Sequence, residues 1–156
     1  MKITFISVGS VKKAFAKEGV DEYLRRIRNY SQVESVEVKE ESSSPKTPRE
    51  RILKKEGERI LGKLAKGDYV VALADSGREF ASASFASFVE GFRVLGKKNL
   101  CFITGGAFGL HKDVLGSADM ILSLSKMTLP HDLARLVLTE QVYRAFTIIR
   151  NEPYSH

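Results

Sequence analysis

Short apolar segments alternate with helical segments along this sequence, and that alternation limits the folds open to the chain. Residues 69–74 and 100–103 are continuous apolar runs of the kind buried on both faces of a parallel sheet. Strand patterns also occur in three further segments, at residues 2–8, 33–38 and 120–124. Helical periodicity occurs in four segments, at residues 19–30, 47–64, 84–95 and 130–149. The alternation of strand and helix predicts an α/β layered fold with a parallel sheet.

The helix starts are predicted from local signals. Thr47 and Glu50 have the spacing of a capping box, with Thr47 as the N-cap. Pro130 suits a first helical turn, because its fixed φ is already helical and its missing N–H would have had no intrahelical partner.

Size and composition are those of one globular domain spanning residues 1–156. Hydrophobic residues make up 43% of the chain and charged residues 28%, and no internal repeat or boundary interrupts it. No apolar run approaches the roughly 20 residues of a membrane span, and the first residues, MKITFISV, lack a signal-peptide pattern. The single cysteine, Cys101, lies in an apolar run. We therefore expect a cytoplasmic protein without a membrane partner.

Positive charge is concentrated in the first part of the chain. Lys and Arg outnumber Asp and Glu by 16 to 10 in residues 1–67, whereas the two kinds are equal, at 9 each, in residues 68–156. A basic face of this kind suits a protein that docks on a polyanion. An ordinary solvated surface explains the charge equally well.

Three polar segments follow predicted strands, at residues 73–77, 104–109 and 124–129. The carboxyl ends of parallel strands lie along one edge of a sheet, and ligands bind in the crevice there. Tight turns without a ligand are the alternative for Gly105 and Gly106. The glycines do not form a dinucleotide or phosphate-loop motif, and the three histidines lack metal-ligand spacing, so we expect no metal.

The predicted helix at residues 130–149 is apolar on more than one side. A helix of this kind must be covered over most of its circumference. A second copy of the protein is the favoured cover, and a central position within one chain is the alternative. The apolar residues concerned are Leu133, Leu136, Val137, Val142, Tyr143, Phe146, Ile148 and Ile149.

Four motifs carry a resemblance to a known family: ITGGAFGLHKDVL, LSLSKMTLPHDLARLVLTEQVYRAF, DEYLRRIRNY and ILKKEGERIL. Together they resemble the ribosomal large subunit methyltransferase H family, a group within the SPOUT superfamily of S-adenosylmethionine-dependent RNA methyltransferases. The resemblance covers essentially the whole chain. It implies a parallel-sheet SPOUT-type methyltransferase domain with a C-terminal trefoil knot, working as a homodimer.

The resemblance also implies the reaction and the cofactor site. The family methylates N3 of a pseudouridine in 23S ribosomal RNA, and the assembled ribosome is the expected substrate. A non-catalytic RNA-binding protein and a transfer RNA methyltransferase are the alternatives. A side chain at position 105 is expected to fill the crevice. The implied contacts to S-adenosylmethionine are Leu73, Gly105, Leu124, Ser125, Lys126, Met127, Thr128 and Leu129.

The target nitrogen must lose a proton, and His131 is the first candidate to receive it. The alternative role for His131 is to cap or orient the adjacent turn. Arg135, one helical turn further along, is expected to meet a phosphate or a base carbonyl. Arg144 is expected to pair with Glu140 at i, i+4 instead.

The C-terminal tail supplies the last two candidates. Tyr154 and His156 are expected to approach the target base across the dimer, and a frayed terminus is the alternative. The family commonly has His directly after Tyr, whereas Ser155 intervenes here, which weakens the assignment of His156. Phe108 lies in the segment at residues 104–109, here called the glycine loop, and either stacks on a base or fills the core.

Overall fold

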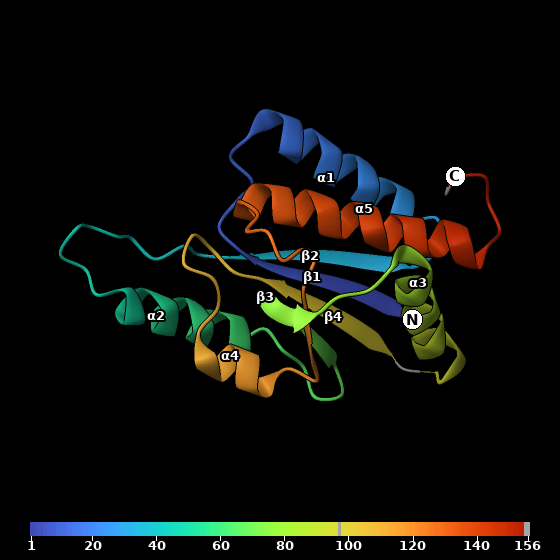
Figure 1. The fold of residues 1–156 in the computed structure, drawn as a ribbon. Coiled ribbons are helices and arrows are strands. Elements are labelled where there is room, and N and C mark those ends of the chain that lie inside the picture. The colour runs from blue at the N-terminus through green and yellow to red at the C-terminus, as the bar shows by residue number, and fades with distance from the viewer. Residues whose placement is uncertain (97, 155–156) are drawn as a thin grey trace.

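Five parallel strands form one sheet in the order β2-β1-β4-β3-β5 (Figure 1). The structure is a computed structural model that describes residues 1–96 and 98–154. The strands are β1 (Lys2–Val8), β2 (Gln32–Val38), β3 (Tyr69–Arg78), β4 (Asn99–Thr104) and β5 (Met120–Leu122). The helices are α1 (Ala14–Ile27), α2 (Arg49–Leu61), α3 (Ser82–Val94), α4 (Lys112–Ser117) and α5 (His131–Ile149). The predicted α/β fold with a parallel sheet is confirmed, and the trefoil knot stays a prediction.

Helices cover both faces of the sheet. Figure 1 shows α1 beside α5 on one face and α2 beside α4 on the other. Leu100 and Phe102 of β4 pack in the core under α1, α3 and α5, whereas Cys101 and Ile103 pack in the core facing α2 and α4. Burial on both faces explains the continuous apolar strands. Burial also raises the pKa of the Cys101 thiol to about 12, as expected of a structural cysteine.

The apolar helix α5 is covered within its own chain. It packs against α1 along one flank and against α3 along the other, above the sheet. Val142, Ala145 and Phe146 are buried in this layer. The chain itself therefore supplies the cover on these sides of α5. Cover by a second copy stays a prediction.

The start of α1 differs from the prediction. The helix begins at Ala14, five residues before the predicted start at residue 19. The carboxylate of Asp132, at the start of α5, accepts the backbone N–H groups of Lys12 and Lys13 at 3.1 and 3.0 Å. These two N–H groups lie just before the first residue of α1, where the N-cap residue makes no side-chain capping bond. The stabilising residue is more than a hundred positions away, so a local pattern cannot reveal it.

The predicted capping box at Thr47 is wrong. Helix α2 begins at Arg49, and its N-cap residue, Pro48, makes no side-chain capping bond. Thr47 Oγ1 instead accepts the N–H of Ser44 at 3.1 Å, closing the preceding turn. The carboxylate of Glu50 lies 2.9 Å from His111 Nε2.

His111 starts a short helix that the sequence patterns did not predict. Its ring nitrogen Nδ1 accepts the N–H of Asp113 at 3.2 Å, so a histidine acts as the cap of α4. Strand β3 is also longer than predicted. It runs through Gly77 to Arg78, where it pairs again with Leu122 after a bulge.

Glu56 of α2 is a buried carboxylate beneath the glycine loop. Its Oε1 accepts the N–H of Glu41 at 3.0 Å. A Cβ at Gly106 would lie 3.4 Å from Oε2 of Glu56, so the loop after β4 passes close to this carboxylate. Burial raises the pKa of Glu56 above its ordinary value, against the opposing effect of the Glu41 hydrogen bond.

A glycine pair tests the contact between β3 and β5. A Cβ at Gly77 would lie 2.6 Å from the carbonyl carbon of Leu122, whereas Gly91 in α3 has nothing within 4 Å. We expect Gly77→Ala to lower the free energy of unfolding by about 1–3 kcal/mol, because backbone must move. The control Gly91→Ala should be neutral or gain up to ~1 kcal/mol from helix propensity. Urea denaturation measures both, and equal stability of the two variants would contradict this packing.

Glu56→Gln tests the buried carboxylate. A pKa raised on folding means that Glu56 favours the folded state most when protonated, and that this contribution is lost as the pH rises through the raised value. We therefore expect Glu56→Gln to gain stability relative to the unmodified protein as the pH rises from acid to neutral. Urea denaturation at several pH values measures the difference. A difference that is constant with pH would contradict the burial argument.

Candidate functional site

A cleft of about 770 Å³ opens at the carboxyl edge of β4, β3 and β5. Its walls come from residues 73–76 of β3, where the pairing with β5 is interrupted by a bulge, from residues 104–110 after β4, and from the turn and helix start at residues 124–131. Arg49 of α2 also borders it. The prediction that three strand ends meet at one crevice is therefore confirmed.

The glycine loop is tightly closed on itself. Gly109 has a φ of +83° and donates its N–H to the carbonyl of Gly106 at 3.1 Å. A Cβ at Gly105 would lie 2.4 Å from the carbonyl oxygen of Gly109. The expectation that a side chain at position 105 would fill the cleft is therefore wrong, because it would first displace the loop backbone. The contact of Gly105 with a cofactor stays a prediction.

Serine side chains hold the turn after β5 in place. Ser125 Oγ accepts the N–H of Met127 at 3.0 Å, and Ser123 Oγ donates to the carbonyl of Ser125 at 3.1 Å. The backbone N–H of Ser123 donates to the carbonyl of Arg78, which joins the turn to β3. A turn fixed in this way presents its edge to the cleft with little freedom.

Seven of the eight predicted cofactor residues line the cleft. Lys126 is the exception among them, because its exposed side chain is not part of the wall. Met127 lies at the mouth with 78% of its surface exposed. The residues that line the wall are Leu73, Gly105, Leu124, Ser125, Met127, Thr128 and Leu129.

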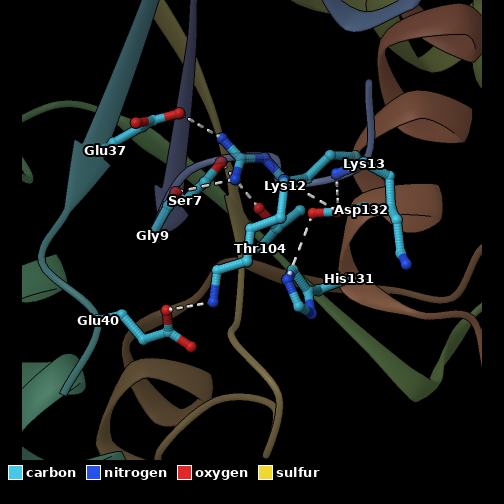
Figure 2. Close-up of polar contacts among 10 residues, drawn as sticks. Ser7, Gly9, Lys12, Lys13, Glu37, Glu40, Thr104, His131 and Asp132 are labelled. Atoms are coloured by element: carbon cyan, nitrogen blue, oxygen red, sulfur yellow. Dashed lines mark hydrogen bonds and ion pairs between the residues drawn. The ribbon is translucent and has the colours of Figure 1, made fainter. Parts of the chain in front are cut away.

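Of the predicted catalytic residues that the structure describes, His131 borders the cleft, whereas Arg135 and Tyr154 do not. His131, at the start of α5, lines the cleft with 28% of its side chain exposed. Its Nε2 lies 3.3 Å from Oδ1 of the buried Asp132. Figure 2 shows this contact beside the bonds from Asp132 to the start of α1. Asp132 was not singled out in the sequence, because an acidic residue in a first helical turn is common.

Arg135 is buried and does not border the cleft. Its guanidinium donates from Nη1 to the carbonyl of Gly9 at 2.9 Å and from Nη2 to Glu37 at 3.0 Å. Both partners lie at the ends of β1 and β2. The structure thus gives Arg135 a place that joins α5 to the sheet, and its predicted contact with a phosphate or base stays a prediction.

The tail residue Tyr154 packs on α1 and α5 of its own chain. Its hydroxyl lies 3.2 Å from that of Tyr23 and donates to Glu140 at 3.1 Å, and its ring centroid is 4.7 Å from that of Tyr143. Burial raises the pKa of Tyr154. A frayed end is therefore the wrong alternative for this residue. His156 lies outside the described residues.

The predicted pairing of Arg144 with Glu140 is confirmed by a bond of 2.9 Å from Nε. Phe108 lies at the cleft rim rather than in the core, with 38% of its surface exposed. The guanidinium of Arg49 stands 5.5 Å from its ring centroid and donates to its carbonyl at 2.9 Å. No short-range pattern joins two residues 59 positions apart, so Arg49 was missed as a rim residue.

The part of the chain that the structure describes shows neither a metal site nor a membrane-spanning helix. Among residues 1–96 and 98–154, no group of three or more His, Cys, Asp or Glu side chains is arranged to hold a metal ion. None of the helices described has the length and apolar character needed to cross a membrane.

Comparison with known proteins identifies the family. A family described as "Predicted SPOUT methyltransferase" matches residues 1–156. Proteins named ribosomal RNA large subunit methyltransferase H from Carboxydothermus hydrogenoformans and Lysinibacillus sphaericus are each 45% identical, with 99% of both chains covered. A solved structure of a probable methylase family protein from Haemophilus influenzae shares the fold, with a TM-score of 0.54 at 14% identity over 99% of this chain and 70% of that one. The chain therefore belongs to the SPOUT methyltransferases, among relatives named ribosomal RNA large subunit methyltransferase H.

Proposed function

We propose that this enzyme transfers the methyl group of S-adenosylmethionine to N3 of a pseudouridine in 23S ribosomal RNA. The observation that carries the proposal is the cleft at the carboxyl edge of β4, β3 and β5, in a chain whose close relatives are named as ribosomal RNA methyltransferases. The assembled ribosome is the proposed substrate. The two alternatives differ from this proposal in a methyl-transfer assay. A non-catalytic RNA-binding protein would transfer no methyl group, and a transfer RNA methyltransferase would methylate transfer RNA.

The cleft fits a nucleoside with a sulfonium side chain. Its volume lies within the range of about 300–1,000 Å³ found for small-molecule sites. Leu73, Leu124 and Leu129 supply apolar walls, and the serine-braced turn supplies a fixed backbone edge for an adenine. When bound, S-adenosylmethionine supplies a methyl group that is already activated for transfer. The task left to the protein is mainly alignment, which can be worth ~7–11 kcal/mol of barrier in well-oriented reactions.

His131 is the proposed proton acceptor. It is the one predicted catalytic residue that borders the cleft among those described. An imide N–H must lose its proton as the N–C bond forms, and a neutral imidazole at this edge can take it. Arg135 supports the site from the sheet side through Gly9 and Glu37.

The exposed basic side of helix α2 is the proposed binding surface for RNA phosphates. Arg25 and Arg26 of α1 both pair with Glu22, which offsets part of the positive charge of this helix. Arg51 and Lys54 are exposed on α2, whose start borders the cleft through Arg49. Attraction of RNA phosphates to α2 would therefore bring a ribosomal RNA loop to the cleft mouth.

A homodimer is part of the same proposal. The exposed apolar side chains of Val94 and Leu95 adjoin Ile148 and Ile149 in a shallow groove between the ends of α3 and α5. The predicted approach of Tyr154 and His156 to a target base in the partner's cleft belongs to this dimer proposal.

Leu129→Asn tests the cofactor cleft. It replaces an apolar wall residue by a polar one of similar size, and we expect S-adenosylmethionine to bind about 10 to 100 times more weakly, the equivalent of burying one leucine. Leu64→Asn is the matched control, since Leu64 is also half-buried but faces the α2 and α4 side. Isothermal titration measures both affinities. Equal affinities of the two variants for S-adenosylmethionine would contradict its binding in this cleft.

The double variant Arg51→Glu with Lys54→Glu tests the RNA face. We expect weaker association with ribosomes and a salt dependence whose slope falls by about one to two, because each lost phosphate contact removes roughly 0.7–0.9 from it. Arg25→Glu with Arg28→Glu changes the charge equally at the C-terminal end of α1 and should have the smaller effect. Sedimentation with ribosomes at several salt concentrations measures both. A larger loss from the α1 variant would reverse the assignment of the face.

A further inference from the structure

A buried carboxylate links the cleft to the start of α1. Asp132 has 5% of its surface exposed, and its Oδ2 accepts the backbone N–H groups of Lys12 and Lys13. Its Oδ1 is buried as well, yet has no hydrogen-bond partner within the described residues. That oxygen lies 3.3 Å from Nε2 of His131 (Figure 2). A buried carboxylate oxygen without a partner is costly, so a small turn of the histidine ring that completes this bond would be favourable.

We propose that Asp132 is a positioning residue that fixes the tautomer and orientation of His131. In this arrangement Oδ1 accepts a hydrogen bond from Nε2–H. A neutral imidazole carries one proton, so Nδ1 is left with the free electron pair. Because Nε2 faces the buried carboxylate, Nδ1 is the nitrogen left to act toward the cleft. The inference rests on the proposed function, since it gives the aligned nitrogen a substrate.

The basic side chains of Lys12 and Arg135 are bound to other groups, so they do not compete with His131 for the Asp132 carboxylate. Lys12 Nζ pairs with Glu40 at 3.0 Å (Figure 2). The guanidinium of Arg135 is bound to Gly9 and Glu37. The two backbone N–H groups hold Oδ2, so the carboxylate cannot rotate freely. Asp132 is thus fixed by the start of α1 and offers its second oxygen to one neighbour.

The tautomer matters for the proton transfer. The N3–H proton of the target base passes to His131 Nδ1, and the electron pair left on N3 forms the bond to the methyl carbon. The carbon–sulfur bond breaks at the same time, and its electron pair stays on sulfur, which loses its positive charge. His131 becomes an imidazolium beside the Asp132 carboxylate, which stabilises that charge. The opposite tautomer would present an N–H to the substrate and could not accept the proton.

Asp132→Asn separates positioning from folding. The asparagine carbonyl can still accept the N–H groups of Lys12 and Lys13, but its NH₂ group can only donate toward His131. Nε2 must then accept, and the imidazole proton moves to Nδ1. We expect kcat for methyl transfer to fall about 100-fold, in the range known for general-base catalysis, with the affinity for S-adenosylmethionine unchanged. Asp119→Asn is the matched control, because Asp119 also accepts a backbone N–H, from Val70 at 2.7 Å.

Nitrogen NMR of ¹⁵N-histidine-labelled protein gives a reading independent of activity. His131 signals are assigned from their loss in His131→Gln. We expect the unmodified protein to show the Nε2–H tautomer and Asp132→Asn to show the Nδ1–H tautomer. An Nδ1–H tautomer in the unmodified protein, or the same tautomer in both, would overturn the inference even if the variant were unstable. Absence of methyl transfer by the unmodified protein would instead overturn the proposed function, and the spectra would still decide the pairing.

Discussion

Close approach of backbone to backbone at the carboxyl edge of the sheet determines the shape of the site. At Gly77 the strand β3 passes so close to residues 121–122 that no Cβ fits, and at Gly105 the loop after β4 folds back onto Gly109 in the same way. These two contacts keep three chain segments within one small volume. The cleft is the space left between them, with apolar walls because the strands beneath are buried on both faces.

Asp132 connects that edge to the helical layer. One carboxylate holds the N–H groups that precede α1, and the same residue stands in the first turn of α5 beside His131. Arg135, one turn later, ties α5 to the ends of β1 and β2. The position of the histidine therefore depends on contacts with the first strand and the first helix of the chain. A site residue that looks local in the sequence is held by partners far away in it.

The sequence patterns predicted what local periodicity controls. Continuous apolar runs such as residues 100–103 identified the parallel strands, and the polar segments after them identified the cleft, because both follow from burial on two faces. The start of α1 could not be predicted, since its stabilising carboxylate comes from Asp132. Thr47 has a capping-box pattern, but its hydroxyl is used by a turn instead. Arg135 and Arg49 show the same limit, because the partner of a long side chain is set by tertiary packing.

A single reaction is proposed at this edge of the sheet, methylation of ribosomal RNA at a pseudouridine N3. Transfer of labelled methyl from S-adenosylmethionine tests it most directly, with intact ribosomes, protein-free 23S RNA and transfer RNA offered in parallel. We expect label in the ribosome sample, confined to one pseudouridine of 23S RNA. Label in transfer RNA, or no label in any sample while the cofactor binds, would contradict it.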